Sequence, residues 1–363
     1  MNRRTIGASA RGLAVLCITL GLSSAAASEA GAGGATDADP LFRSASILEL
    51  ELTGPVSRIA RDRRADPEER DAVLSWRSPE GDTGTLAVEV RARGKSRRQR
   101  DVCAFPPLRL DLPRSETPGT LFEHQDKLKL VTHCVPLGST VPTQHEYVAL
   151  ERLAYELLNL LTDVSFRVRA VRITYVDDDD GERATHPAFL IEHEDRLAAR
   201  LGLTVSEATS VPGSVMDADH RTRAEIFQFL IGNTDFSFHA SADGERCCHN
   251  AVQFVDAAGV HFPVPYDFDR TGLLDKPGVR PARGLGIRRV TERRFVGPCR
   301  APADFDRILD EFRARRAEID GALAETSELR DRKRGRTERF LDAFWATLED
   351  PRRVERAFLG RCG

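Results

Sequence analysis

The sequence predicts an α+β fold with two lobes, because strand patterns fill its first half and helical patterns dominate its second. Apolar and polar residues alternate over 48–52, 86–90 and 108–112, which is typical of half-buried antiparallel strands. One helix interrupts the strands. Thr143 and Glu146 form a capping-box pattern, and leucines follow at helical spacing as far as residue 161.

The boundary between the lobes is expected near Glu192, where the character of the chain changes. Residues 166–176 and 187–192 have strand patterns, and the acidic run 177–181 lies between them. A solvated hairpin turn is the preferred interpretation of this run over a calcium loop, because no EF-hand spacing follows. Helical patterns then cover 197–203, 221–231 and most of the last sixty residues, with short strands at 251–255 and 260–264. We therefore expect a β-rich N-terminal lobe over 41–193 and a mostly helical C-terminal lobe over 194–363.

The first 40 residues predict export. Arg3, Arg4 and Arg11 precede a short apolar core, and the small residues 25–27 provide a cleavage site. This is the arrangement of a signal peptide over 1–27, and its core is too short to span a membrane. Residues 28–40 are mostly Gly, Ala and acidic residues, which indicate a flexible linker. The expected localisation is periplasmic or secreted, with no transmembrane segment after cleavage.

Cysteine usage agrees with an oxidising compartment. Cleavage at this site would leave six cysteines, and an even number in an exported protein favours disulfide bonds. Cys103 and Cys134 flank two consecutive strand patterns, so that pairing them would staple the N-terminal lobe. A zinc site is the weaker alternative, because no CxxC pair occurs.

The charge of the chain argues against nucleic acid as a partner. The formal net charge is -3, and removal of Arg3, Arg4 and Arg11 with the signal peptide takes it to -6. A mildly acidic chain has no general electrostatic attraction for a polyanion.

The residues with the clearest chemical pattern lie between 231 and 269. Asp235 follows an apolar helical segment, Asn250 begins a strand, and Asp267 and Asp269 end the next strand. A β-hairpin would bring Asp267 beside Asn250. One loop Asp, an Asn and an Asp are the minimum apparatus for phosphoryl transfer, because the first can take the acceptor proton while the others hold Mg²⁺ on the phosphates. The alternative is that all four are caps of loops, turns and strand ends.

The order Gly-Asn-x-Asp, His-Asn and Asp-Phe-Asp resembles the spore-coat protein kinases of the CotH-like group and, more distantly, HipA-type and phosphoinositide-type kinases. The resemblance covers residues 146–273 and implies a two-lobed atypical protein-kinase-like fold with ATP and Mg²⁺ as cofactors. It implies that Asp235 is the catalytic residue and that Asn250, Asp267 and Asp269 form the metal site, although classical kinases have Gly at the position of Asp269. The chain is also similar to uncharacterised exported bacterial proteins that share Arg-Gly-Lys, Phe-Pro-Pro-Leu and Pro-Tyr-Asp-Phe-Asp.

The nucleotide phosphates would need a lysine from the first half. Only five Lys occur beside 48 Arg, and Lys127 and Lys129 alternate with leucines, which places both ammonium groups on one strand face. Lys129 is the first choice for the phosphates, and a solvated strand face is the alternative. Glu146 or Glu151 could be its carboxylate partner, and Glu192 at the hinge completes the cofactor-binding candidates.

The basic turn that begins at Arg93 could cover phosphates or dock an acidic substrate, and a solvent-exposed hairpin loop is the simpler alternative. The predicted function is thus ATP- and Mg²⁺-dependent phosphoryl or nucleotidyl transfer to a protein or another hydroxyl acceptor. Two alternatives stay open. One is a catalytically inactive kinase-fold binding or scaffold protein of the cell envelope, because ATP is scarce outside the cytoplasm. The other is a metal-dependent phosphohydrolase that uses the same carboxylates.

Overall fold

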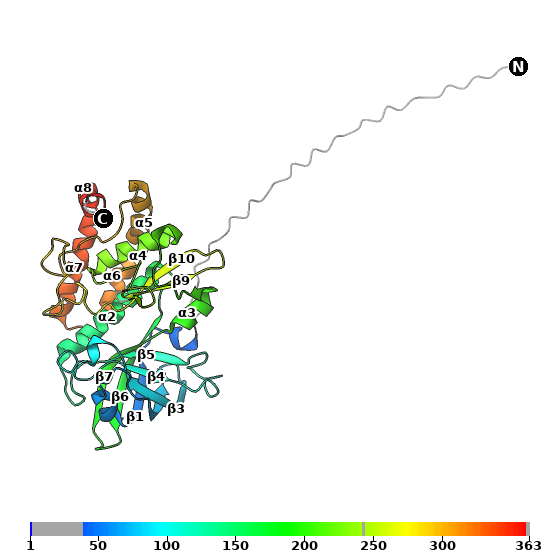
Figure 1. The fold of residues 1–363 in the computed structure, drawn as a ribbon, viewed down its shortest axis with the longest axis vertical. Coiled ribbons are helices and arrows are strands. Elements are labelled where there is room, and N and C mark those ends of the chain that lie inside the picture. Colours follow the sequence, from blue (N-terminus) through cyan, green and yellow to red (C-terminus); the bar gives the residue numbers. More distant parts are fainter. Residues whose placement is uncertain (2–38, 242–243, 361–363) are drawn as a thin grey trace. The chain divides into compact units, whose positions relative to one another are not determined.

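The computed structural model describes Met1 and residues 39–241 and 244–360. Apart from Met1, the expected signal peptide over 1–27 lies outside these residues, as does most of the linker expected over 28–40. The described chain contains a closed β-barrel and a larger, mainly helical part, and Figure 1 shows the barrel strands below the helices α4–α8.

Seven strands form the barrel, and each alternates buried and less buried residues along at least part of its length. They are β1 (Leu48–Gly54), β2 (Arg70–Arg77), β3 (Thr83–Ala92), β4 (Leu108–Asp111), β5 (Lys127–Val131), β6 (Val168–Asp177) and β7 (Arg183–Ile191), in the order β1-β2-β3-β4-β5-β7-β6. Neighbouring strands are antiparallel except β1 and β6, which pair in parallel from Leu48 opposite Val171 to Gly54 opposite Asp177. That last pairing closes the sheet and removes its open edges.

The predicted two-lobed kinase-like fold is wrong, because the strands of the first half close into this barrel. Period-two alternation shows which face of a strand is buried, and it was correct for β1, β3 and β4. It carries no information on which strand lies beside which. The deciding contact joins β1 to β6, whose paired residues are more than a hundred positions apart.

Helix α1 (Val56–Arg61) packs on the barrel, and its residues Val56, Ile59 and Ala60 belong to the barrel core. The other helices pack around a second core. They are α2 (Pro142–Leu161), α3 (Glu194–Leu201), α4 (Ala218–Ile231), α5 (Pro302–Ala314), α6 (Arg316–Glu325), α7 (Asp331–Leu348) and α8 (Pro351–Val354). A small sheet of β8 (Thr204–Val205), β9 (Ala251–Val255) and β10 (His261–Pro265) lies beside them. Buried residues of the barrel form one hydrophobic cluster, and those of α2, α4 and the C-terminal helices form another.

Helix α2 connects the two parts, since it packs against β7 and also against α4 and α6. The capping box expected at its start is absent. The helix begins at Pro142 without a side-chain cap, and the Glu146 carboxylate accepts hydrogen bonds from Arg330 at 2.8 and 2.9 Å instead. Glu146 therefore ties α2 to the segment before α7.

Disulfide bonds were expected without a fixed connectivity, and Cys103 pairs with Cys134, with Cα atoms 4.8 Å apart. It joins the segment after β3 to the segment after β5. Cys247 and Cys248 form a second, adjacent pair. Within the described part of the chain, no helix is long and apolar enough to cross a membrane.

Candidate active site

The segment Asp267–Phe268–Asp269 follows β10 and is anchored by its central ring. Phe268 is fully buried between Tyr155 of α2 and Phe227 of α4, with ring centroids 4.6 and 5.5 Å away. The backbone N–H of Asp267 donates to the Tyr155 hydroxyl at 2.9 Å. Burial of the ring fixes the loop, so that the carboxylates on either side are held at the surface of the core.

Three carboxylates meet at one guanidinium. Nη2 of Arg97 lies 3.1 Å from Oε1 of Glu151, 3.1 Å from Oδ1 of Asp267 and 2.9 Å from Oδ2 of Asp269. Glu151 comes from α2, whereas Arg97 lies in the 3₁₀ helix η2 (Ser96–Arg98) between β3 and β4. We call Glu151, Asp267 and Asp269 the acidic cluster.

The acidic cluster is partly shielded from water and is not neutralised completely. The side chains of Glu151 and Arg97 are 5 % and 16 % exposed. Lys276 adds a second positive charge, 3.8 Å from Asp269, so three carboxylates face two cations. Burial tends to raise the pKa of Asp269, but the nearby Arg97 and Lys276 hold it below its usual value. Burial also raises the pKa of Glu151.

Asp235 and Asn250 lie next to this loop, as the hairpin prediction required. Nδ2 of Asn250 donates to the backbone oxygen of Asp235 at 2.6 Å, and the backbone N–H of Tyr266 donates to the backbone oxygen of Asn250 at 3.0 Å. The Asp235 carboxylate contacts His249 at 3.0 Å and Arg270 at 3.2 Å. Hydrogen bonds therefore link the loop of Asp235 to the residue before Asp267.

The turn that positions Asp235 depends on a glycine. Gly232 ends α4 with a φ of 66°, and a Cβ there would lie 2.8 Å from the backbone oxygen of Val290. The next residue, Asn233, is buried and accepts the N–H of Asp235 on its side chain at 2.9 Å. Only glycine satisfies both the left-handed backbone and this close approach.

Backbone conformations that are uncommon for side-chain-bearing residues gather here. Asn250 and Asp267 have φ values of 53° and 60°, and Asp275, next to Lys276, has a φ of 45°. Asn and Asp adopt this region more readily than other residues, yet it still carries a cost that folded proteins tend to accept at functional sites.

Two cations near Asp267 lack a carboxylate partner. Within the described residues no carboxylate lies within 4.0 Å of Arg93 or Lys129, although both experience the field of Asp267. The Lys129 ammonium lies 5.3 and 5.8 Å from the rings of Tyr266 and Phe166. Burial lowers its pKa to about 8. We call Arg93 and Lys129 the basic pair.

The other cofactor-binding candidates lie elsewhere. Lys127 shares the strand face of Lys129, but its nearest carboxylate is Asp126 at 3.9 Å. Glu146 binds Arg330, as described above. Glu192 is buried and pairs with Arg200 at 3.0 Å. The last two hold structural elements together, and neither is the partner of Lys129.

A cavity of about 460 Å³ opens beside the acidic cluster. Its walls include Glu151, Asp269, Arg97, Arg270, Lys276, Tyr147 and the segment Thr132–Cys134. It offers carboxylates, cations and an aromatic ring to a ligand, which is the mixture that a polar ligand with an apolar portion requires.

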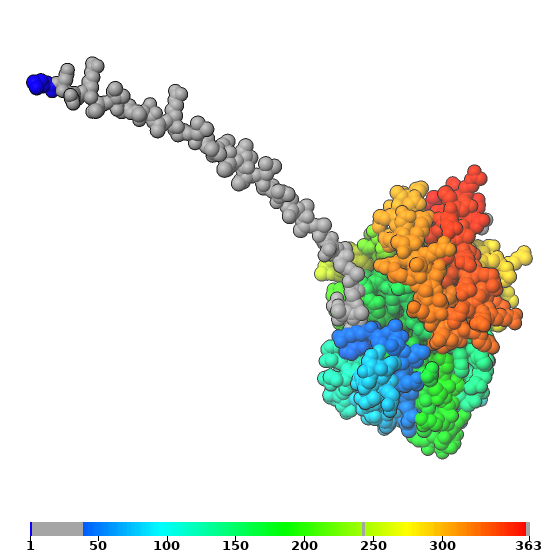
Figure 2. Space-filling model, turned by 180° about the vertical axis from the view of Figure 1, so that it is seen from behind, coloured from blue at the N-terminus to red at the C-terminus, as the bar shows by residue number. Residues whose placement is uncertain are grey.

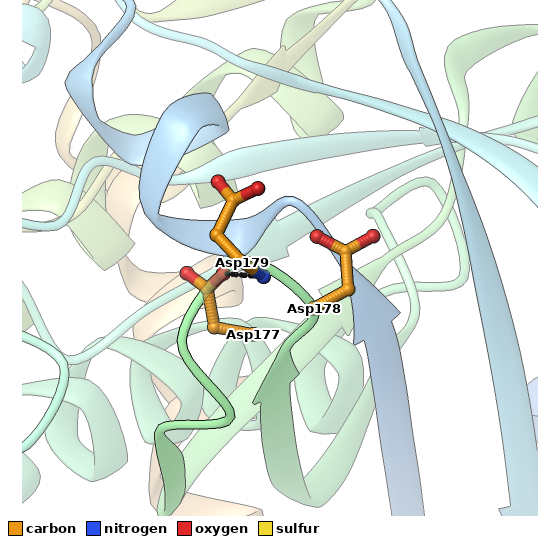
Figure 3. Close-up of side chains that lie close together, drawn as sticks. All are labelled: Asp177, Asp178 and Asp179. Atoms are coloured by element: carbon orange, nitrogen blue, oxygen red, sulfur yellow. Dashed lines mark hydrogen bonds between the residues drawn. The ribbon is translucent and has the colours of Figure 1, made fainter.

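The acidic run after β6 is a turn. The carboxylate of Asp177 accepts from the N–H of Ser57 at 2.5 Å and from that of Asp179 at 2.9 Å. Figure 3 shows Asp177, Asp178 and Asp179 beside α1, and Arg58 of that helix pairs with Asp179 at 2.7 Å. Among the described residues, only these three acids bring ligand atoms within 4.8 Å of one another. Their contacts are nevertheless those of a helix cap and an ion pair.

The oxygen ligands of the acidic cluster are of the type that Mg²⁺ prefers. The Arg97 guanidinium lies between these oxygens and keeps them apart. Unlike the carboxylates of Asp177–Asp179, they do not all lie within 4.8 Å of one another, as judged over the described residues. A bound cation would therefore have to replace Arg97 at the centre of the cluster.

Sequence reasoning missed Arg97 as the counter-ion of the cluster, and it also missed Lys276. The rarity of lysine was a usable signal, because Lys129 and Lys276 are two of only five in the chain. A scan against models of known protein families and a search of the curated proteins found no match.

Proposed function

We propose that the chain transfers a phosphoryl group from a nucleoside triphosphate, held with Mg²⁺, to the hydroxyl of an acceptor. The observation that carries this proposal is that Asp267 of the acidic cluster follows Tyr266, whose ring lies 5.3 Å from the Lys129 ammonium, while no carboxylate of the described residues lies within 4.0 Å of Lys129 or Arg93. Carboxylates suit Mg²⁺, and unpaired cations suit phosphate oxygens. Phosphoryl transfer needs these two kinds of group together, because its catalysis is mostly positioning and charge stabilisation.

Each group has a separate role in this proposal. Asp267 and Asp269 hold the magnesium ion, which offsets the negative charge of the triphosphate when bound. Lys129 and Arg93 bind phosphate oxygens. Asn250 uses its amide nitrogen to fix the loop of Asp235, which leaves its side-chain oxygen for the cation.

Asp235 takes the proton of the acceptor hydroxyl. The acceptor oxygen forms a bond to the terminal phosphorus, the bond from that phosphorus to the bridging oxygen breaks, and the nucleoside diphosphate leaves. His249 and Arg270 orient the Asp235 carboxylate through their contacts at 3.0 and 3.2 Å. The side chain of Asp235 is 39 % exposed, so an acceptor has access to it.

A second candidate is a binding protein of the cell envelope without catalysis. It is favoured by Arg97, because a guanidinium within 3.1 Å of all three carboxylates already occupies the position that a cation would need. We also propose that the protein is exported. The Cys103–Cys134 pair supports this, because such bonds persist in oxidising compartments.

Two asparagine variants test the proposal. Asparagine tolerates the left-handed backbone of Asp267 (φ 60°), so Asp267→Asn removes charge without adding strain. We expect this variant to lose magnesium-dependent nucleotide binding at least tenfold in isothermal titration. Asp235→Asn should bind the nucleotide within about twofold of the parent and lose transfer to an acceptor, because Asp235 acts on the hydroxyl alone.

The matched control is Asp342→Asn, which changes an exposed carboxylate on α7 and should alter neither property. A parent protein that binds no nucleotide would refute the proposal. A parent that binds nucleotide but transfers nothing to hydroxyl acceptors would favour the binding-protein candidate.

A further inference from the structure

The segment from Lys276 to Arg300, which we call the basic loop, is a strongly basic stretch of the described chain. It contains eight Lys or Arg, and Glu292 is its one acidic residue, whereas the whole chain has a formal charge of -3. It contains no helix or strand. In Figure 2 the yellow segment that includes part of this loop stands out at the right edge of the surface.

Three arginines of the basic loop are exposed and have no carboxylate partner. Arg280, Arg283 and Arg288 are all exposed, and no carboxylate of the described residues lies within 4.0 Å of their guanidinium groups. Most other arginines of the described residues are paired with a carboxylate, and the C-terminal helices contain several such ion pairs. These three are therefore available to an anionic partner.

The basic loop is held against the candidate active site. Lys276 lies 3.8 Å from Asp269 of the acidic cluster. The N–H of Ala282 donates to the Thr234 hydroxyl at 3.0 Å, and Thr234 precedes Asp235. Further along, Val290 is buried, and Arg293 lies 3.7 Å from the centroid of Phe340.

These contacts determine where the unpaired arginines of the basic loop lie. Arg280 and Arg283 flank Ala282, whose hydrogen bond holds the loop to the residue next to Asp235. Pro277 and Val279 of the same loop line the cavity beside the acidic cluster. A molecule that docks on the loop would thus lie next to the carboxylate that we assign to the acceptor hydroxyl.

We infer that the basic loop is the docking surface for the acceptor, and that the acceptor is an acidic polypeptide segment carrying a hydroxyl side chain. This inference rests on the proposed function, in which the acceptor is the molecule whose hydroxyl receives the phosphoryl group. The guanidinium fork of arginine matches a carboxylate in two parallel hydrogen bonds. Three guanidinium groups without a carboxylate partner within nine residues match a short run of Asp or Glu in the bound peptide.

A polypeptide fits this surface better than a nucleic acid. Phe295 is the one aromatic residue of the basic loop, and it is buried, so that no ring is offered for the stacking of bases. The net negative charge of the remaining chain also disfavours a long polyanion that continues past the loop.

The test is a binding titration without nucleotide, so that failure of the proposed function does not obscure it. A fluorescein-labelled peptide of alternating Glu and Ser is titrated with the full chain by fluorescence anisotropy. We expect the variant Arg280→Glu, Arg283→Glu, Arg288→Glu to bind this peptide at least tenfold more weakly than the parent. Affinity of the parent should fall between 50 and 300 mM salt.

The matched control is Arg332→Glu, Arg339→Glu, Arg356→Glu. It makes the same change in net charge at three exposed arginines that lie outside the basic loop and have no carboxylate of the described residues within 4.0 Å. This control should keep the peptide affinity within about threefold, allowing for long-range repulsion. Both variants should keep the thermal unfolding temperature of the parent.

Three results would overturn the inference. They are an equal loss of affinity in the two triple variants, no peptide binding by the parent, and tighter binding of a labelled oligothymidine than of the peptide. Nucleotide affinity is measured separately on the same proteins. Peptide binding without nucleotide binding would refute the proposed function and leave the docking surface standing.

Discussion

Replacing Arg97 with alanine is expected to destabilise the protein and to make its stability depend on magnesium. The side chain of Arg97 is 16 % exposed, and it faces carboxylates that are 5 %, 42 % and 21 % exposed. Removal of one partner from a buried ion pair costs about 3–5 kcal/mol. Because Asp267 is well exposed to solvent, we place the loss at the lower end, about 3 kcal/mol.

This loss corresponds to a fall of about 6 °C in the thermal unfolding temperature, at about 2 °C per kcal/mol for a chain of this size. Magnesium should restore most of it in the variant, because the cation can occupy the position that the guanidinium leaves. A ligand at a hundred times its dissociation constant stabilises the folded state by about 2.7 kcal/mol. The parent should respond much less, since Arg97 competes for the same oxygens.

The assay is thermal unfolding with and without 10 mM MgCl₂, with sodium chloride added to equalise the ionic strength. Arg100→Ala is the matched control, because Arg100 lies in the same segment and is exposed. It should be as stable as the parent under both conditions. If Arg97→Ala were no less stable than Arg100→Ala, or if magnesium raised all three proteins equally, the competition between guanidinium and cation would be refuted.

Two further predictions concern stability. Burial lowers the pKa of His220 to about 4, whereas the unfolded chain has a pKa of about 6.5 at this residue. The free energy of unfolding that neutral His220 contributes is therefore complete above pH 6.5 and is lost as the pH falls towards 4. The loss from this residue is about 3 kcal/mol. Urea unfolding at pH 7.0, 5.5 and 4.5 should show a shallower pH dependence in His220→Asn, and an unchanged slope would contradict the assignment. Changing both Cys103 and Cys134, which are 31 positions apart, to alanine should cost about 3–4 kcal/mol through the larger entropy of the unfolded chain. Reduction of the parent should produce a similar loss, and equal stability of parent and variant under oxidising conditions would contradict this expectation.

The sequence was informative where a structure depends on neighbours along the chain. The strand β1 and the helix α4 could be predicted from their alternation and periodicity, and so could the hairpin that brings Asn250 near Asp267. Local patterns specify these features, because the burial of one face or the length of one turn decides them. The pairing of Cys103 with Cys134 joins the segment after β3 to the segment after β5, and the sequence alone left the connectivity of the cysteines open.

The predictions that were wrong concern features that depend on contacts between segments far apart in the sequence. The parallel pairing of β1 with β6 closes the barrel, and no residue of either strand signals its partner. Glu146 was assigned a capping role from the residue three positions before it, yet Arg330 takes its carboxylate from 184 positions away. In the sequence, Arg97 looked like one arginine of a solvated turn. In the folded chain it contacts Asp267, which is 170 positions away in sequence.

The segment that carries Arg97 is held unequally at its two ends, and this decides how a cation could enter. Towards β4, the Arg63 guanidinium donates to the carbonyl oxygens of Cys103 and Ala104 at 3.0 and 2.7 Å, beside the pairing with Cys134. Towards β3, the corresponding tie is Lys95 with Glu245, and these side chains are 80 % and 59 % exposed.

An exposed ion pair contributes only about 0–1 kcal/mol, so the end towards β3 is the weaker one. Rotation of η2 away from the acidic cluster would break that exposed pair, the contacts of Arg97 and the hydrogen bond at 2.9 Å from Arg63 to the carbonyl oxygen of Arg98, while the Cys103 end remains fixed. The cost of such a movement is then the loss of the Arg97 contacts, which the alanine variant measures, together with the loss of this hydrogen bond. Exchange of guanidinium for magnesium therefore requires a local shift of η2 and no rearrangement of the barrel.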